Sequence, residues 1–429
     1  MRARRWAGAV TGLGLAASVL LPVSGADAAE RHGGGGARPC PTLDASLPWY
    51  GENRAALQEF IDEAGRCGRN AGRHGPRPLA LFDWDNTVVK NDVGDATTFW
   101  SLRNGKIRQP PGKDWSRTSP YLTPAASAAL SAACGTATPA GRPLPTGTDA
   151  DCADEILSVY SSGTSTAGAA AFAGYDHRRM EPAYAWANQL LAGYTEREVA
   201  GFAAAARAEN LAAPVGTLQQ VGTKQVTGWV RYYDQQRDLI AVLKRAGFDV
   251  RIITASPQTV VQVWGRSLGI APDEVVGIDS RTRNGKRTYD IRGCGGAADN
   301  TVITYLDGKR CFVNQDILGV RGAKAYELQP AERRQKFGAG DSDTDATFVR
   351  DATGLRLAVN RQKTELMCRA YANADGRWLV QPMFIEPRGQ KATPYPCSTA
   401  GYVNPDGSKA PLLDDAGNVV PDQVDRVHG

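Results

Sequence analysis

The chain has 429 residues, of which 42% are hydrophobic and 22% charged, and its formal net charge is +5 at pH 7. This length is enough to bury a large core and to hold a main domain with an insertion. The charge is too small to indicate a nucleic-acid or membrane-surface partner, and the sequence has no basic run with interleaved aromatic residues.

Residues 1–28 are typical of a secretory signal. Arg2, Arg4 and Arg5 precede an apolar stretch that runs through Val23, and Ala26-Asp27-Ala28 offers a cleavage site. The arginine pair also suits twin-arginine export, but the residues after it fit that pattern poorly, so general secretion is favoured. An uncleaved anchor is the alternative, although the apolar stretch is short and interrupted by glycine. We expect a secreted or extracytoplasmic protein with no stable membrane insertion after cleavage.

The cysteine and histidine patterns bear on disulfides and metals. An even number of cysteines in an exported chain favours disulfides, and spacing alone leaves their connectivity open. Pairing of sequence neighbours gives Cys40–Cys67, Cys134–Cys152, Cys294–Cys311 and Cys368–Cys397. No pair has C-x-x-C spacing, and the four histidines (His32, His74, His177 and His428) are scattered, which argues against zinc chemistry.

The first half of the chain predicts one strand and a long insertion. A glycine linker precedes a helix over 53–64, and the apolar run Leu79–Phe82 predicts a buried strand. Residues 96–228 contain no second strand of similar quality. Their first part, to about residue 165, is rich in Gly, Pro, Ser and Ala and predicts an irregular excursion. The second part predicts helices, one over 182–191 and one opened by a capping box at Thr195–Glu198.

Alternating helices and strands follow the insertion. We expect a helix over 232–246, a strand over 248–253, a hairpin of 301–306 and 309–313 around Asp307-Gly308, a helix near Ala325, and strands ending at Gly340 and Val359. This pattern predicts an α/β fold, a doubly wound parallel sheet with an inserted, mainly helical cap. The expected divisions are a signal peptide (1–28), a linker and N-terminal helix (29–76), a core (77–95 and 229–385), the cap (96–228) and a C-terminal extension (386–429).

Four stretches carry residues suited to phosphoryl transfer. In chain order they contain Asp83-x-Asp85, Thr254, Lys324 and Asp341-x-x-x-Asp345. Because the carboxyl ends of parallel strands line one crevice, these groups can converge. One carboxylate can attack phosphorus while another transfers the proton, and carboxylate oxygens favour Mg²⁺. A hydroxyl and an ammonium can hold the phosphoryl oxygens.

This ordered set resembles the phosphatase branch of the haloacid dehalogenase (HAD) superfamily, whose fold is a Rossmann-like parallel sheet. The resemblance implies that Asp83 is the nucleophile and that Asp85 is the acid/base, with its backbone carbonyl at the metal. It places Mg²⁺ on Asp83, Asp341 and Asp345. It assigns phosphate binding to Thr254 and Lys324. The presence of Asp85 argues against the dehalogenases proper.

A closer resemblance concerns the substrate. Asp83-x-Asp85-Asn86-Thr87, the export signal and Leu357–Arg361 look most like bacterial phosphorylcholine phosphatases, whose core is similar to that of phosphoserine phosphatases. The acidic loop is one residue shorter than in that group and the insertion, of the type called a C1 cap, is longer. The implied partner is a small phosphorylated metabolite, with phosphocholine as a candidate. Six aromatic residues of the cap and its border could form a cage for a quaternary ammonium or simply pack in the core: Tyr175, Tyr184, Trp186, Trp229, Tyr232 and Tyr233.

Several alternatives compete with these assignments. The first two aspartates could close an Asx turn, and Asp341-x-Asp343-x-Asp345 resembles the start of a calcium loop, although Ala346 and Ala352 stand where Gly and Glu belong. Lys336 competes with Lys324, and a solvated lysine remains open. Ser256 competes with Thr254, but Ser256-Pro257 is a natural helix cap, so we assign Ser256 mainly to capping.

Two other functions are also compatible with parts of the sequence. Arg73–Pro78 nearly matches the histidine acid phosphatase signature, but residue 79 is Leu where Pro is required, and no histidine precedes an aspartate. The chain could also be a non-catalytic ligand-binding protein on the same scaffold. Asp85 argues against this second reading, because a binding module does not need an acid/base.

Overall fold

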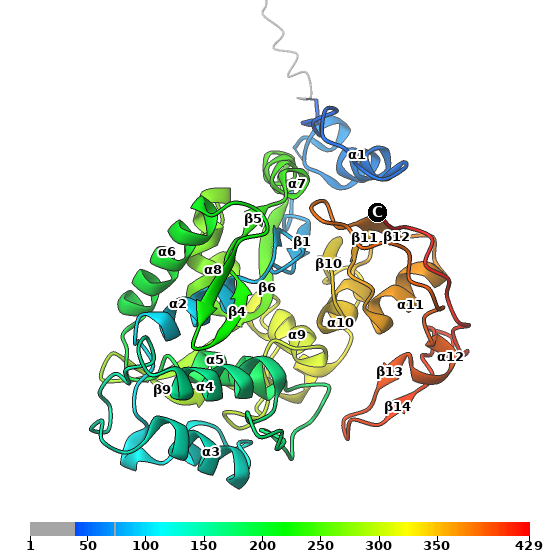
Figure 1. Cartoon of the computed structure of the whole chain (residues 1–429). Helices are drawn as coiled ribbons and strands as arrows, with labels where there is room; N and C mark the ends of the chain where they lie inside the picture. The colour runs from blue at the N-terminus through cyan, green and yellow to red at the C-terminus, as the bar shows by residue number, and fades with distance from the viewer. Residues whose placement is uncertain (1–38, 73) are drawn as a thin grey trace, which may run out of the picture. The chain divides into compact units, whose positions relative to one another are not determined.

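A computed structural model describes residues 39–72 and 74–429, so the predicted signal peptide and glycine linker lie outside the described residues. The centre of the described fold is a parallel six-stranded sheet with strand order β12-β11-β10-β1-β6-β7 (Figure 1). Its strands are β1 (Leu79–Phe82), β6 (Asp249–Pro257), β7 (Val275–Ile278), β10 (Phe337–Gly340), β11 (Leu355–Asn360) and β12 (Trp378–Pro382). The expected α/β parallel sheet is confirmed.

Helices bury both faces of this sheet. Ala80 and Phe82 of β1 belong to one hydrophobic cluster and Leu79 and Leu81 to another, because successive side chains of a strand point to opposite faces. The first cluster includes residues of α1 (Asn53–Ala64), α7 (Asp234–Arg245) and α8 (Gln258–Gly265). The second includes residues of α9 (Asp307–Phe312), α10 (Ala346–Arg350) and α11 (Thr364–Ala372).

The insertion after β1 has a core of its own. It starts and ends with a short antiparallel pair, β2 (Val89–Lys90) with β5 (Arg231–Tyr232). Between them lie α2 (Val93–Arg103), α3 (Pro124–Cys134), α4 (Ala150–Ser162), α5 (Pro182–Gln189), α6 (Glu196–Ala212) and a hairpin of β3 (Leu218–Val221) and β4 (Lys224–Thr227). A hydrophobic cluster formed within this segment includes Leu102, Trp115, Ile156 and Trp186.

The expectation of an irregular excursion up to residue 165 is wrong. Alanine-rich α3 begins after Thr123, whose hydroxyl accepts from the Ala126 amide, and α4 begins after Asp149, whose carboxylate accepts from the Cys152 amide. These caps satisfy amide groups that a helix start would otherwise leave unpaired. The Cys134–Cys152 disulfide joins the two helices. The capping box predicted at Thr195–Glu198 is confirmed.

The hairpin predicted around Asp307-Gly308 is also wrong, because these residues begin helix α9. Gly308 is required there by close approach: a Cβ atom would lie 1.9 Å from the carbonyl oxygen of Ile303. The hairpin of this region comes earlier, as β8 (Ser280–Arg283) and β9 (Lys286–Ile291). Its turn, Asn284-Gly285, has φ values of 53° and 72°, as a primed hairpin turn needs.

Other expectations can be checked directly. The helices over 53–64 and 232–246 correspond to α1 and α7, and the strands after 248, before 340 and around 357 correspond to β6, β10 and β11. The helix near Ala325 is a short 3₁₀ helix, Gly322–Tyr326. All four neighbour pairings of cysteines are confirmed as disulfides. After β12 the chain forms α12 (Cys397–Ala400) and a small pair of β13 (Tyr402–Val403) and β14 (Lys409–Ala410).

Within residues 39–72 and 74–429, no helix combines the length and hydropathy needed to cross a membrane.

Candidate active site

Three buried aspartates meet at the carboxyl edge of the sheet. Asp83 follows β1, Asp341 follows the neighbouring strand β10, and Asp345 lies one 3₁₀ turn further on. One carboxylate oxygen from each lies within 4.8 Å of the others. The parallel pairing of β1 with β10 produces this convergence, because both strands end at the same edge. The structure thus brings together the three predicted metal-site residues whose carboxylates were expected to hold the ion.

Lys309 lies among these carboxylates. Its Nζ is 2.7 Å from Oδ1 of Asp83, 2.6 Å from Oδ1 of Asp345 and 3.0 Å from the carbonyl oxygen of Ile253. The side chain is fully buried. Burial alone would lower the pKa of Lys309, but the Asp345 and Asp83 carboxylates outweigh it and raise the pKa above its usual value.

Lys324, the predicted phosphate-binding lysine, is not in this cluster. It is exposed on the 3₁₀ helix Gly322–Tyr326. Lys336, the alternative, directly precedes β10 and therefore lies at the opposite, amino end of that strand. Sequence reasoning missed Lys309 because the Asp307-Gly308 hairpin signal assigned it to a strand. In the structure this lysine comes from α9, packed beside α10.

Thr87 links two members of the cluster. Its Oγ1 is 3.0 Å from Oδ2 of Asp83 and 3.1 Å from Oδ1 of Asp341. A hydroxyl has one proton, so it can donate to only one of them at a time. The turn Trp84–Val88 places Thr87 here, with the amide of Val88 donating to the Trp84 carbonyl and Asn86 at φ 61°. We did not predict Thr87, although its spacing of four residues from Asp83 was a usable signal.

Asp85 stands apart from the three carboxylates. Its Oδ1 accepts the Val93 amide at 2.7 Å, and its Oδ2 accepts the Ser256 hydroxyl at 2.7 Å. Burial raises the pKa of the Asp85 carboxyl well above its ordinary value, and the carboxylates of Asp92 and Asp83 raise it further. A carboxyl with a raised pKa keeps its proton to a higher pH, as a general acid requires.

At the end of β6, the roles of Thr254 and Ser256 differ from those predicted. Thr254 is fully buried, and its Oγ1 accepts the Ser256 amide at 3.1 Å. The assignment of Ser256 to helix capping is wrong: β6 continues to Pro257, no side chain caps α8, and the Ser256 hydroxyl donates to Asp85 instead. Ser256 therefore joins the site through the acid/base candidate.

The site opens into a cavity of about 50 Å³, which we call the reaction cavity. Its lining contains Asp83, Asp85, Asp92, Gly94, Tyr160, Tyr184, Ala187, Ala255, Ser256, Pro257, Asp341, Ser342, Thr344 and Arg361, without Thr254 or Lys309. A larger space of about 420 Å³, the outer chamber, shares Asp92, Tyr160, Tyr184 and Arg361 with it. The shared residues make the two spaces neighbours, so a ligand can occupy both.

Two acidic residues line the outer chamber, namely Asp95 in the first turn of α2 and Asp92, the N-cap residue of that helix. Asp92 accepts the Asp95 amide at 2.9 Å, and Asp95 accepts the hydroxyl of Tyr160. Burial, followed by repulsion from Asp92, raises the pKa of Asp95 to about 7. Among the described residues, neither carboxylate forms an ion pair with a lysine or arginine. Tyr184 and Trp229 line the chamber, whereas Trp186 and Tyr233, which were also cage candidates, are fully buried.

The geometry does not support the histidine acid phosphatase mechanism or the calcium loop. His74 is exposed and lines a cleft with Leu79 and Asp249, the residues that begin β1 and β6, at the end of the sheet opposite Asp83. The Asp343 carboxylate accepts the Leu366 amide at 3.1 Å and is not one of the three clustered aspartates.

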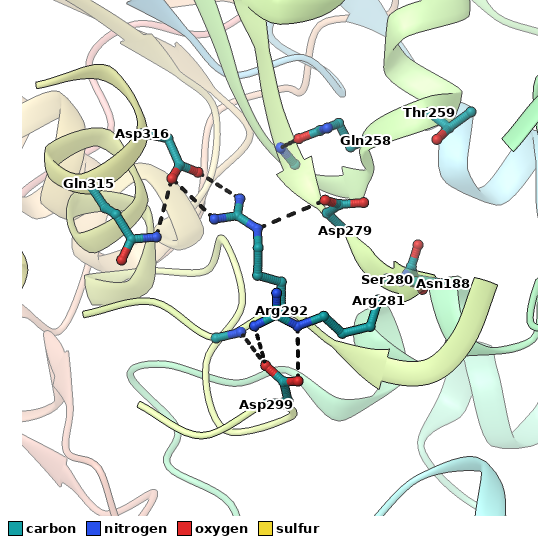
Figure 2. A network of polar contacts seen from close by, with 12 residues as sticks. Asn188, Gln258, Thr259, Asp279, Ser280, Arg281, Arg292, Asp299, Gln315 and Asp316 are labelled. Atoms are coloured by element: carbon teal, nitrogen blue, oxygen red, sulfur yellow. Dashed lines mark hydrogen bonds and ion pairs between the residues drawn. The ribbon is translucent and has the colours of Figure 1, made fainter. Parts of the chain in front are cut away.

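Contacts on several sides fix helix α9, which carries Lys309. The Cys294–Cys311 disulfide attaches it to the segment after β9. In Figure 2, Arg292 of the same segment extends to Asp316, just beyond α9, with nitrogen–oxygen distances of 3.1 and 2.6 Å, and to Asp279 at 3.8 Å. Buried Arg178 of the insertion donates to Asp307 at the start of α9. These bonds fix the helix axis and with it the lysine.

The electrostatics of the cluster suit a divalent cation. Burial raises the pKa of Asp83 well above its ordinary value, and the neighbouring Asp345 carboxylate adds to this against the effect of Lys309. Burial also raises the pKa of Asp341, although Arg361 opposes the shift. A cation between these carboxylates would relieve their repulsion, and an oxygen-only ligand set fits Mg²⁺. The residues therefore fit the predicted metal.

Comparisons with known proteins bear on the fold. Searches against family models and against curated protein sequences gave no match. Among solved structures, the chain is similar to a conserved protein of unknown function from Anaerococcus prevotii, with a TM-score of 0.56, 18% identity and coverage of 81% of this chain and 94% of that one. More distant likenesses are a phosphoserine phosphatase phospho-aspartyl intermediate analogue (TM-score 0.33, 13% identity, coverage 71% and 93%) and cytosolic 5′-nucleotidase IIIB bound to cytidine (0.34, 11%, 77% and 84%).

The described fold is a HAD-like Rossmannoid fold with helical insertions. The six-stranded parallel sheet has its first aspartate motif after the central strand β1, a helical insertion directly after that motif, and its acidic motif after the adjacent strand β10. This is the arrangement that the resemblance of the sequence motifs to the HAD superfamily implies.

Proposed function

We propose that the protein is a Mg²⁺-dependent phosphoric monoester hydrolase that works through an aspartyl-phosphate on Asp83. The observation that carries this proposal is the pairing of two carboxyl groups in one cavity. Asp83 belongs to the buried metal-type cluster and bonds Lys309, whereas Asp85 lines the same cavity without joining that cluster. Burial raises the pKa of both carboxyls, but a cation held by the cluster would favour the ionised form of Asp83, as a nucleophile requires, and would leave Asp85 as the acid/base.

The two aspartates divide the reaction between them. A carboxylate oxygen of Asp83 forms a bond to phosphorus as the bond from phosphorus to the ester oxygen breaks, and the departing alkoxide takes the proton of Asp85. Asp85 then accepts a proton from water, whose oxygen bonds to phosphorus and releases the Asp83 carboxylate and inorganic phosphate. Ser256 and the Val93 amide hold Asp85 in place through both steps.

Asp83, Asp341 and Asp345 would hold the magnesium ion, and the backbone carbonyl of Asp85 is the further ligand implied by the family resemblance. The ion would cancel the repulsion between the attacking carboxylate and the phosphate dianion. The Lys309 ammonium would also reduce this repulsion, because it bonds the carboxylates of Asp83 and Asp345.

For the substrate, we propose a phosphate ester of a small alcohol that carries a positively charged nitrogen, with phosphocholine as the candidate. Asp92 and Asp95 line the outer chamber and form no ion pair with a lysine or arginine among the described residues, although Lys90, Arg361 and Arg388 line the same space. Tyr184 and Trp229 add aromatic faces. A quaternary ammonium is attracted both to carboxylates and to aromatic faces. Export is part of the proposal, supported by four disulfides.

A non-catalytic ligand-binding protein on this scaffold is the second candidate, and turnover separates the two. The experiment is a panel of p-nitrophenyl phosphate, phosphocholine, phosphoethanolamine and phosphoserine with purified protein, with Mg²⁺ and with EDTA. We expect turnover that needs Mg²⁺, is greatest for a cationic ester, and is lost in Asp83→Asn. Binding of phosphocholine without release of phosphate would support the binding protein instead. Turnover that survives EDTA but is lost in His74→Ala would support a histidine mechanism.

A further inference from the structure

We propose that Arg361 receives phosphoryl oxygens of the substrate. This inference rests on the proposed phosphatase function and deepens it, because it assigns the phosphate-binding cation of that site. Arg361 ends the Leu357–Arg361 stretch of the family resemblance, but the sequence analysis assigned it no role.

The first observation concerns Lys309, which has no donor left. An ammonium group has three N–H bonds. The lysine directs them to Oδ1 of Asp83, Oδ1 of Asp345 and the carbonyl oxygen of Ile253, all within 3.0 Å. Its side chain is fully buried and contributes nothing to the cavity lining. Its bonds hold Asp83 and Asp345 in position, which makes it a positioning residue.

The second observation concerns Arg361, which has donors to spare. Its Nη1 donates to Oδ2 of Asp341 at 2.6 Å, and this is the one hydrogen bond found for its guanidinium among the described residues. A guanidinium has five N–H bonds in a planar fork that matches phosphate oxygens. Among the described residues, Arg361 is the single lysine or arginine that lines the reaction cavity, which it shares with Asp83.

The third observation is that the C-terminal segment holds the backbone around Arg361. The preceding residue, Asn360, ends β11, and its side-chain amide donates to Oδ1 of Asp425 at 2.9 Å and to the Val427 carbonyl at 2.7 Å. Its side-chain oxygen accepts the amide of Gln362, the residue after Arg361, at 2.8 Å. Buried Asp425 also accepts the hydroxyl of Tyr371 at 2.6 Å.

These bonds fix both neighbours of the arginine from a segment more than fifty positions away in the chain. A ligand-binding side chain loses less conformational freedom on binding when its backbone is already held in place. The hydrogen bonds around Arg361 therefore suit a residue that binds a phosphate in a defined orientation. The opposing hypothesis is that Arg361 only neutralises Asp341, and the experiment is chosen to separate these two roles.

The experiment measures two affinities by calorimetry on the full-length protein. One is the affinity for inorganic phosphate at saturating Mg²⁺, and the other is the affinity for Mg²⁺ alone. Wild type is compared with Arg361→Met, Arg361→Lys and the control Arg281→Met. Arg281 also pairs with an aspartate, Asp299 at 2.9 Å, but lines neither space. Circular dichroism checks the folding of each variant.

We expect Arg361→Met to weaken phosphate binding by about 10- to 100-fold, because it removes charge-assisted hydrogen bonds to a dianion. Arg361→Lys keeps the positive charge but loses the planar guanidinium donors, so we expect a smaller loss of phosphate affinity. If Arg361→Met does not fold, the test uses Arg361→Lys. Arg281→Met should bind phosphate like wild type. Unchanged phosphate affinity in both Arg361 variants, with or without altered Mg²⁺ affinity, would overturn the proposal. The phosphatase function fails by a different result, namely absence of turnover by wild type.

Discussion

The hydroxyl of Ser256 donates a hydrogen bond to Oδ2 of Asp85 at 2.7 Å and so joins the end of β6 to the motif after β1. The same carboxylate is held on its other oxygen by the Val93 amide, at the start of the insertion. The acid/base candidate is therefore fixed by a residue of the core and by a residue of the insertion. Loss of either bond frees its rotation.

For Ser256→Ala we predict a fall in kcat of about 10-fold with little change in KM, since one hydrogen bond to a charged group is worth about 1.5–3 kcal/mol. Steady-state kinetics on p-nitrophenyl phosphate measures this. Ser398→Ala is a matched control, because its hydroxyl also donates to an aspartate, Asp422 at 2.8 Å, on the exposed surface. An equal loss in the control would remove the link to Asp85.

Lys309→Met should destabilise the protein without Mg²⁺ by about 3–5 kcal/mol, because removal of one partner leaves the buried Asp83 and Asp345 carboxylates uncompensated. Added Mg²⁺ should restore part of the loss. Urea denaturation with and without Mg²⁺ gives the free energy of unfolding. Lys324→Met, at the exposed position predicted from sequence, should change it by less than about 0.5 kcal/mol. The reverse order of effects would contradict the assignment of Lys309.

The Cys294–Cys311 disulfide ends two residues from Lys309, so its loss should affect activity as well as stability. We predict that Cys294→Ala/Cys311→Ala lowers kcat at a temperature at which the variant is fully folded, because α9 loses its attachment. The pair Cys134→Ala/Cys152→Ala, in the insertion, should lower the melting temperature with a much smaller effect on kcat. The measurements are thermal melts and kinetics on both variants, and equal kcat values would show that the disulfide does not position the lysine.

The outer chamber should respond to pH. Asp95 has a pKa of about 7 in the folded protein, above its ordinary value of 3.8, so the chamber gains a negative charge as pH rises through 7. We predict that KM for phosphocholine falls between pH 6 and 8 more than KM for p-nitrophenyl phosphate, and that Asp95→Asn removes the difference. The free energy of unfolding changes in the opposite direction. Protonated Asp95 contributes stability below pH 3.8, and that contribution is lost as the pH rises through about 7. Parallel pH profiles for the two substrates would contradict a cation subsite at Asp95.

The sequence predicted those parts of the site that follow strand ends. Asp83 and Asp341 stand directly after strands β1 and β10, Asp85 and Asp345 follow them within a few residues, and the parallel sheet brings such positions to one edge. Lys309 was missed because the Asp307-Gly308 turn signal marks the start of a helix and not a hairpin, with Gly308 packed against the Ile303 carbonyl of the preceding segment.

The remaining site residues depend on contacts distant in sequence. Ser256 was assigned to a local cap, but its hydroxyl bonds Asp85, 171 positions away. Arg361 follows a predicted strand, yet its meeting with Asp341 depends on the registry of β11 against β10. Likewise, the helices of the first part of the insertion form around their own cluster, with polar caps that a composition rich in Gly, Pro and Ser obscures.

The central claim is that the phosphoryl group passes through the Asp83 carboxylate, and trapping of the intermediate tests it most directly. The enzyme is mixed with substrate and Mg²⁺, quenched and reduced with borohydride, which converts an aspartyl-phosphate to homoserine, and its peptides are analysed by mass spectrometry. We predict homoserine at position 83, dependent on both substrate and Mg²⁺. With p-nitrophenyl phosphate, whose leaving group needs no proton, we predict more of it in Asp85→Asn, in which hydrolysis of the intermediate lacks its base. Turnover with no conversion at position 83, or conversion at another residue, would contradict it.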